Sequence, residues 1–107
     1  MRNSKKYVAD LDIFGTTYKL YLFDYDCEYY GSTDFEKKRI LIDCHLDYEK
    51  LVETLTHELM HAHFYECGLE QYASDETLIK CLGRWFLGVN NRVAGLVYLI
   101  NKAGFGK

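Results

Sequence analysis

The chain has 107 residues, of which 49% are hydrophobic and 16% aromatic, so it can bury one hydrophobic core but not two separate ones. Its 13 basic and 16 acidic residues give a net charge of -3, which excludes the basic surface typical of nucleic-acid-binding domains. We therefore expect a single domain over residues 1–107, with residues 1–6 as a flexible tail.

The four cysteines, Cys27, Cys44, Cys67 and Cys81, form no CxxC pair, and no signal peptide precedes them. We expect reduced thiols in a cytoplasmic protein, because two disulfides would need an oxidising compartment, and we expect Cys44, Cys67 and Cys81 to fill small apolar gaps. The longest apolar stretch, residues 93–100, is too short to cross a bilayer, so no membrane association is expected.

The first half of the chain has the pattern of β-strands. Residues 7–14 and 18–25 alternate in part between apolar and polar side chains, and the residues between them, 15–17, have turn chemistry. This pattern predicts a β-hairpin. Residues 31–34 are expected to form a turn, and the β-branched run at 39–43 predicts a third strand, or two short ones in this region.

The second half predicts helices. Asp47 is a suitable N-cap, Leu46 and Leu51 have the spacing of a hydrophobic staple, and Gly68 is a suitable C′ residue for the first helix.

A second helix is expected to begin after Ser74 as its N-cap and to end at Gly88 or at Asn90-Asn91. A third, C-terminal helix is then expected over residues 93–100. Strands followed by helices indicate an α+β fold.

The first helix contains the segment His57-Glu58-Leu59-Met60-His61, which matches the pattern HExxH. Side chains four residues apart lie on one helix face, so both imidazoles can bind one Zn²⁺ ion, and Glu58 is placed to accept a proton from zinc-bound water. With four His and eight Glu in the chain, roughly 0.01 matches are expected by chance, so the sequence predicts a zinc site.

A catalytic zinc needs a third protein ligand and one open position. Asp75 and Glu76 begin the next helix, which can fold back across the first. Glu76 shares a helical face with Ile79 and Phe86, whereas Asp75 is better placed to stabilise the helix N-terminus. We expect Glu76 to be the third ligand, with Asp75 as the alternative.

Three segments between Gly31 and Leu82 extend this pattern. They are G-S-T-D-F-E-K-K-R-I-L-I-D from Gly31, L-T-H-E-L-M-H-A from Leu55, and Asp75-Glu76 followed by Ile79 and Leu82. The pattern resembles small zinc metallopeptidases of the ImmA/IrrE kind, common in bacteria and their mobile elements, including phages. Ile79 stands where that family often has a small residue.

The resemblance implies a zincin-like (gluzincin-type) fold with a small antiparallel or mixed sheet of about three strands, the HExxH helix and a ligand helix. It also implies His57 and His61 as zinc ligands, Glu58 as general base and Glu76 as third ligand. The strand over residues 36–43 would be the edge strand that pairs with an extended substrate.

We therefore expect a zinc-dependent endopeptidase that hydrolyses a peptide bond in a protein substrate such as a repressor or a host protein. The alternative is a zinc-containing regulator or inhibitor from a mobile element that acts by protein binding. Glu58 argues against it, because a structural zinc site needs no base. A SprT-like protease acting on DNA-bound protein would need a basic surface, and the net charge of -3 argues against that.

Four further residues are weighed as neighbours of the site. Tyr65 and Tyr72 flank the bend between the two ligand helices, where a phenol could donate to an oxyanion, although most of the ten tyrosines must serve packing. His63 is expected on another side of the helix and His45 in a loop. The run Lys37-Lys38-Arg39 is expected to be the solvated rim of an edge strand.

Overall fold

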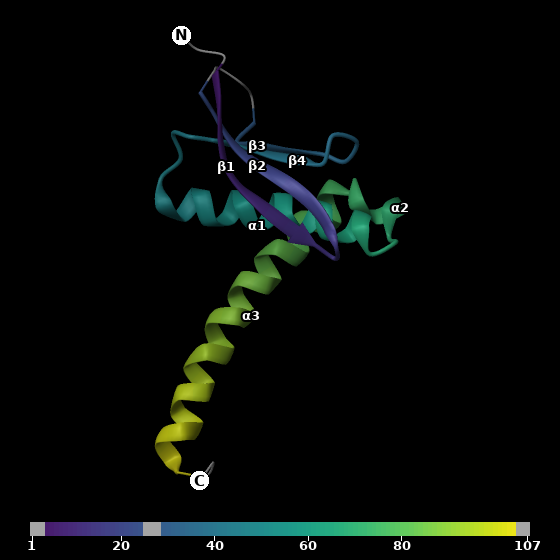
Figure 1. Ribbon diagram of the computed structural model, residues 1–107. Coiled ribbons are helices and arrows are strands. Elements are labelled where there is room, and N and C mark those ends of the chain that lie inside the picture. The colour runs from purple at the N-terminus through teal and green to yellow at the C-terminus, as the bar shows by residue number, and fades with distance from the viewer. Residues whose placement is uncertain (1–3, 25–28, 105–107) are drawn as a thin grey trace.

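The structure is a computed structural model that describes residues 4–24 and 29–104. Within these residues the chain is α+β, with the elements β1 (Ser4–Ile13), β2 (Thr16–Asp24), β3 (Gly31–Asp34), β4 (Arg39–Asp43), α1 (Tyr48–Glu66), α2 (Glu70–Ala73) and α3 (Glu76–Ala103). The strands form one mixed sheet in the order β1-β2-β4-β3, and α1 lies across one face of it (Figure 1).

β1 and β2 form the predicted hairpin, with two differences. β1 begins at Ser4, so residues 4–6 belong to the sheet rather than to a tail, while residues 1–3 lie outside the described part. The turn consists of Phe14 and Gly15, whose φ angles of 52° and 87° are both positive. A two-residue type I′ turn needs two positive φ angles, and its twist matches that of the strands it joins.

Residues 31–34 form a strand, β3, where a turn was expected. β3 pairs antiparallel with β4, and β4 pairs in parallel with β2 on its other side. Among the described strands β4 is therefore interior and β3 is an edge, so the expected edge strand over residues 36–43 is wrong. Residues 36–38 belong instead to the turn between β3 and β4, where Asp34 Oδ1 accepts backbone hydrogen bonds from Glu36 and Lys37, each at 3.0 Å.

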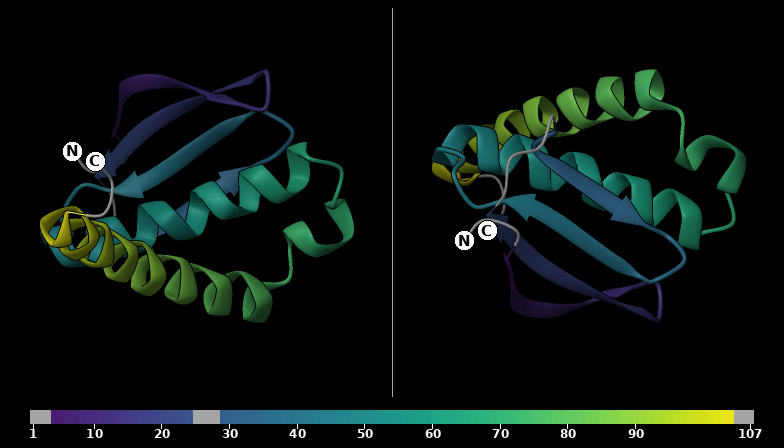
Figure 2. Two further views of the ribbon diagram at one scale, coloured as in Figure 1. Left: turned by 90° about the horizontal axis from the view of Figure 1, so that it is seen from below. Right: turned by 90° about the horizontal axis from the view of Figure 1, so that it is seen from above.

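The core lies between the sheet and α1 (Figure 2). Alternate residues of β4, Ile40 and Ile42, are buried together with Ile13, Tyr18 and Ala62. Leucines from both layers surround this cluster: Leu11, Leu20, Leu22, Leu46, Leu51, Leu55 and Leu59. The period of two in the strands and of 3.6 in the helix places apolar side chains on the two facing surfaces.

α1 begins and ends where the sequence predicts. Asp47 Oδ1 accepts a hydrogen bond from the backbone N–H of Lys50 at 2.9 Å. At the other end Gly68 has φ 94°, and the N–H of Leu69 donates to the carbonyl of Phe64 at 3.0 Å, which is the hydrogen bond of a Schellman motif. This end turns the chain through α2 into α3.

α3 differs most from the prediction. Its N-cap is Asp75 rather than Ser74, and it continues through Gly88 and Asn90-Asn91, so the expected break and the separate helix over residues 93–100 are wrong. Gly and Asn lower helix propensity by about 1 kcal/mol or less each, which weakens a helix without ending it. The second half of α3 extends away from the rest of the molecule (Figure 1). None of the described helices is long and apolar enough to cross a membrane.

Candidate metal centre

Two helices bring the predicted ligands together. His57 and His61 lie one turn apart on α1, and Glu76 is the first residue of α3. The two Nε2 atoms are 3.2 Å apart, His57 Nε2 is 2.9 Å from Glu76 Oε1, and His61 Nε2 is 3.2 Å from Glu76 Oε2. Residues from separate helices thus present two nitrogens and a carboxylate to one point.

These separations fit a metal ion. Tetrahedral zinc with bonds of about 2.0–2.1 Å holds its nitrogen and oxygen ligands about 3.3 Å from one another. The observed distances between ligand atoms, 2.9, 3.2 and 3.2 Å, are close to that value. Two imidazoles and one carboxylate are also a donor set that zinc commonly takes at catalytic sites.

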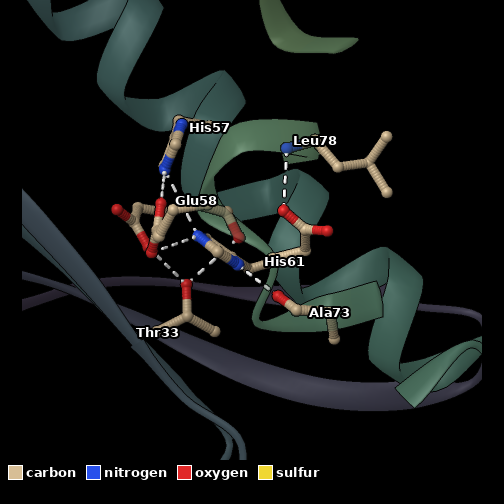
Figure 3. Close-up of polar contacts among 8 residues, drawn as sticks. Thr33, His57, Glu58, His61, Ala73 and Leu78 are labelled. Atoms are coloured by element: carbon tan, nitrogen blue, oxygen red, sulfur yellow. Dashed lines mark hydrogen bonds and ion pairs between the residues drawn. The ribbon is translucent and has the colours of Figure 1, made fainter. Parts of the chain in front are cut away.

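His61 is held with Nε2 directed at this cluster. It is only 5% exposed, and its Nδ1 lies within hydrogen-bond distance of the backbone carbonyl of Ala73, at the end of α2 (Figure 3). A carbonyl can only accept, so Nδ1 carries a proton and Nε2 of the neutral ring presents a lone pair. A carbonyl partner of this kind orients histidine ligands in many metal sites.

The cluster requires positive charge between its members. The lone pair of His61 Nε2, the neighbouring nitrogen of His57 and the carboxylate of Glu76 are electron-rich atoms at distances of 2.9 to 3.2 Å. Electron-rich atoms this close repel unless protons or a cation lie between them. The arrangement is therefore suited to a divalent cation.

Glu58 lies beside the cluster without belonging to it. The residue is 6% exposed, and its carboxylate accepts a hydrogen bond from the hydroxyl of Thr33 on β3, with 2.7 Å between the oxygens (Figure 3). Burial raises the pKa of Glu58 above its ordinary value, whereas the Thr33 hydrogen bond and the two imidazoles lower it. The net result is a raised pKa, which makes the carboxylate a stronger proton acceptor.

Gly31 allows β3 to approach Glu58. A Cβ at this position would lie 2.9 Å from Thr54 Cγ2, 3.1 Å from the carbonyl oxygen of Leu41 and 3.2 Å from Glu58 Cγ. From the sequence, Gly31 and Thr33 were expected in a turn, and neither was expected to have a role at the site. Their spacing of two, which puts both on one side of a strand, is the signal that could have found them.

Two cavities adjoin the cluster. The larger, of about 440 Å³, is lined by His57, Glu58 and Glu76 and by Tyr29 and Tyr30 before β3. The smaller, of about 270 Å³, lies between β3 and the start of α3 and also reaches Glu58 and Glu76. Tyr29 and Tyr30 were missed because the segment before β3 was interpreted only as a source of turns.

Tyr65 and Tyr72, which the sequence placed at the bend between the two ligand helices but did not favour as oxyanion donors, lie away from the cluster. The ring of Tyr65 stacks on Phe35 with centroids 4.4 Å apart, and Tyr72 is 43% exposed. Within the described part of the chain, neither lines the two cavities at the cluster. The structure does not bring them to the site.

The remaining histidines also lie apart from the cluster. His63 Nδ1 donates to the backbone carbonyl of Leu59 at 2.7 Å, and its ring contacts Phe14 edge-on. His45 lies in the loop after β4, where its Nε2 is 2.7 Å from Asp24 Oδ1. His63 thus points away from the cluster and His45 lies in a loop, as the sequence predicts, and His45 lies close to potential metal-ligand atoms of Asp24 and Cys44.

Three cysteines are free thiols at exposed positions: Cys44, Cys67 and Cys81. The expectation that they fill apolar gaps is therefore wrong, because none of them reaches the core. Cys27 lies outside the described residues.

Comparison of the chain with protein-family models, curated proteins and solved structures finds no match. The chemical interpretation of this site therefore depends on the geometry and the donor atoms described above.

Proposed function

We propose that the protein is a zinc-dependent endopeptidase in which His57, His61 and Glu76 bind the metal and Glu58 is the general base. The observation that supports this most strongly is the convergence of three ligand atoms beside a buried carboxylate that is not one of them. A structural zinc site normally takes four protein ligands and has no use for a base. Three ligands leave one position for water or substrate.

The roles of the residues follow from their positions. Zinc, when bound, lowers the pKa of water and polarises a peptide carbonyl. Glu58 takes the proton from the attacking water and delivers it to the leaving amine, and the Thr33 hydroxyl holds the Glu58 carboxylate in place. The Ala73 carbonyl keeps His61 Nε2 directed at the cluster.

The surroundings suit an extended peptide. β3, at the sheet edge, carries Thr33, which contacts Glu58, so a chain paired with β3 would pass beside the catalytic carboxylate. The cavities of about 440 and 270 Å³ adjoin the same residues and provide space for substrate side chains. A protein or peptide substrate is therefore the class that this site fits best.

The metal assignment is tested by zinc analysis of protein purified without added metal. We expect about one zinc per chain, and His57→Ala and Glu76→Ala should each lower zinc affinity by orders of magnitude against a competing chelator. Asp75→Ala is the matched control, because it removes an acid one residue away and should cost only the roughly 0.5–2 kcal/mol of an N-cap. Zinc retained by Glu76→Ala but lost from Asp75→Ala would transfer the ligand role to Asp75.

The catalytic assignment is tested with Glu58→Gln on a peptide library. This variant should keep its zinc and its fold but cleave nothing, because an amide cannot accept the proton of water. Full activity in Glu58→Gln, or loss of its metal, would contradict the role given to Glu58. A wild-type protein that binds zinc and cleaves no peptide would favour the alternative, a zinc-containing regulator.

A further inference from the structure

The distal half of α3 is not covered by the rest of the chain. Of the α3 residues, all of which the structure describes, Ile79 and Gly83 are buried, whereas residues 90–104, which include the C-cap, are all exposed. Figure 1 shows this half extending beyond the sheet and α1, and the molecule measures 55 Å along its longest axis against 32 and 26 Å. An isolated helix in water gains little stability without a packed apolar face.

A regular apolar stripe, which we call the α3 seam, runs along the whole of α3 and continues through its exposed half. Its residues recur at alternating spacings of three and four: Ile79, Leu82, Phe86, Val89, Val93, Leu96, Ile100 and Ala103. An average spacing of 3.5 residues is the heptad pattern of helices that pack along one another. In the part from Phe86 to Ala103, one heptad position holds Phe86, Val93 and Ile100 and the other holds Val89, Leu96 and Ala103, so Val93 and Ile100 with Leu96 match the combination that favours two-stranded coiled coils.

From Phe86 onward the seam is exposed except at Val89, which is half-buried. Phe86 is 44% exposed, Val93 49%, Leu96 51% and Ile100 56%. Flanking apolar side chains, among them Trp85 at 62% and those of residues 97 and 99, widen the stripe. Together they present several hundred Å² of apolar surface, which approaches the roughly 800 Å² per partner of a stable protein interface.

The charges on α3 lie outside the seam. After Glu76 the charged residues of the helix are Lys80, Arg84, Arg92 and Lys102, and none of them occupies a seam position. Two copies of the seam can therefore meet without a charge at a seam position, while Arg92, on the same flank as Trp85 and Leu99, can extend its guanidinium to solvent at the rim. The proximal end, at Ile79, is already packed inside the chain, so the open part begins at Phe86.

We propose that the α3 seam from Phe86 to Ala103 is a dimer interface at which a second copy of this chain packs helix against helix. The heptad spacing indicates a helix as the partner, and the uncharged seam is compatible with an identical one. This interface is separate from the zinc ligands, because from Val93 onward its members lie on the half of α3 that extends away from the rest of the molecule, whereas Glu76 is the first residue of the helix (Figure 1).

The test is the mass of the full chain by sedimentation equilibrium at micromolar concentrations. We expect twice the chain mass of 12.6 kDa. The double variant Leu96→Glu/Ile100→Glu should be monomeric, because it places charges in the seam at residues exposed in the single chain. The matched control, Asn91→Glu/Asn101→Glu, adds the same charges to the same stretch away from the seam and should remain dimeric.

Circular dichroism of both double variants checks that the fold is retained. A wild-type chain that stays monomeric at about 100 µM, or a dimer that survives Leu96→Glu/Ile100→Glu, would overturn the proposal. A monomer that sediments with vesicles of anionic lipid would also overturn it, and would assign the seam to a membrane surface. Zinc removal leaves the expected mass unchanged, so the result does not depend on the proposed function.

Discussion

At the scale of single residues, Gly31 determines how closely the edge strand approaches the Glu58 carboxylate. A side chain at this position would meet Thr54, Glu58 and the backbone oxygen of Leu41, and a backbone oxygen moves less easily than a side-chain end. The absence of a side chain at Gly31 therefore lets Thr33 reach Glu58 from the same strand.

We expect Gly31→Ala to displace β3 from α1 and to lengthen the Thr33–Glu58 hydrogen bond. Overpacking of this kind costs typically about 1–3 kcal/mol of stability. In the proposed enzyme, kcat/KM should fall by about tenfold or more while zinc is retained. Urea unfolding, zinc analysis and peptide cleavage measure the three effects.

Gly88→Ala is the control, because a Cβ there meets nothing within 4 Å. In a helix interior this change should stabilise the protein by about 0.5–1 kcal/mol. Gly31→Ala with wild-type stability and activity would show that β3 can move without affecting Glu58.

At the scale of elements, Glu66 joins the end of α1 to the sheet. Its carboxylate accepts hydrogen bonds from Lys38 and Tyr18, each at 2.7 Å, and from Thr16 at 3.1 Å. Lys38, which was expected on a solvated rim, therefore lies against α1. The Lys38 hydrogen bond, then that of Tyr18, holds the pKa of Glu66 below its ordinary value. These contacts also compensate a negative charge at a helix C-terminus, where it is otherwise unfavourable.

This network predicts a pH-dependent contribution to stability. The pKa of Glu66 is lower in the folded than in the unfolded chain, so the contribution is complete above the unfolded pKa of about 4.3 and is lost as pH falls through the folded pKa. Glu66→Gln should lower the free energy of unfolding by about 1.5–3 kcal/mol at pH 7, and by less at pH 3. Urea titrations at both pH values measure the difference.

Glu36→Gln, at an exposed position in the turn after β3, is the control and should change stability by less than about 0.5 kcal/mol. A loss for Glu66→Gln that is equal at pH 7 and pH 3 would mean that the ionised carboxylate is not what stabilises this junction.

At the scale of the whole molecule, the base of α3 is attached through a small area. Ile79 and Gly83 are its buried residues, and Glu76 is the first residue of the helix. In the proposed enzyme the metal links Glu76 to His57 and His61 and so joins α3 to α1. Metal binding should therefore stabilise the fold as well as the site.

Zinc at 100 times its dissociation constant should raise the free energy of unfolding by about 2.7 kcal/mol. For a chain of this size the melting temperature should rise by about 4–8 °C for each kcal/mol. Calorimetry with zinc and with a chelator measures the shift, and magnesium, which prefers oxygen ligands, should have little effect. Glu76→Ala should lose most of the rise, and an equal rise in that variant would argue against the link between α1 and α3.

The sequence by itself determined features that depend on residues a few positions apart. The hairpin, the Asp47 N-cap and Gly68 as the C′ residue of α1 were predicted, because turns and caps are set by local side chains and by backbone conformations that glycine favours. The placement of His57, Glu58 and His61 on one helix was predictable for the same reason. Glu76 was preferred over Asp75 because it shares a helical face with the apolar residues Ile79 and Phe86, and the structure places Glu76 beside both imidazoles.

Only the tertiary structure decided which groups from distant segments meet. The parallel pairing of β4 with β2 made β3 the sheet edge. α2 brought the backbone carbonyl of Ala73 to His61, and because every residue has a backbone carbonyl, no residue type in the sequence indicates this contact. The local sequence could not determine whether α3 continues past Gly88 and Asn90-Asn91, because Gly and Asn lower helix propensity by only about 1 kcal/mol or less each. The exposure of Cys44, Cys67 and Cys81 and the approach of β3 to Glu58 likewise depend on the relative positions of whole elements, and short-range spacing does not specify these.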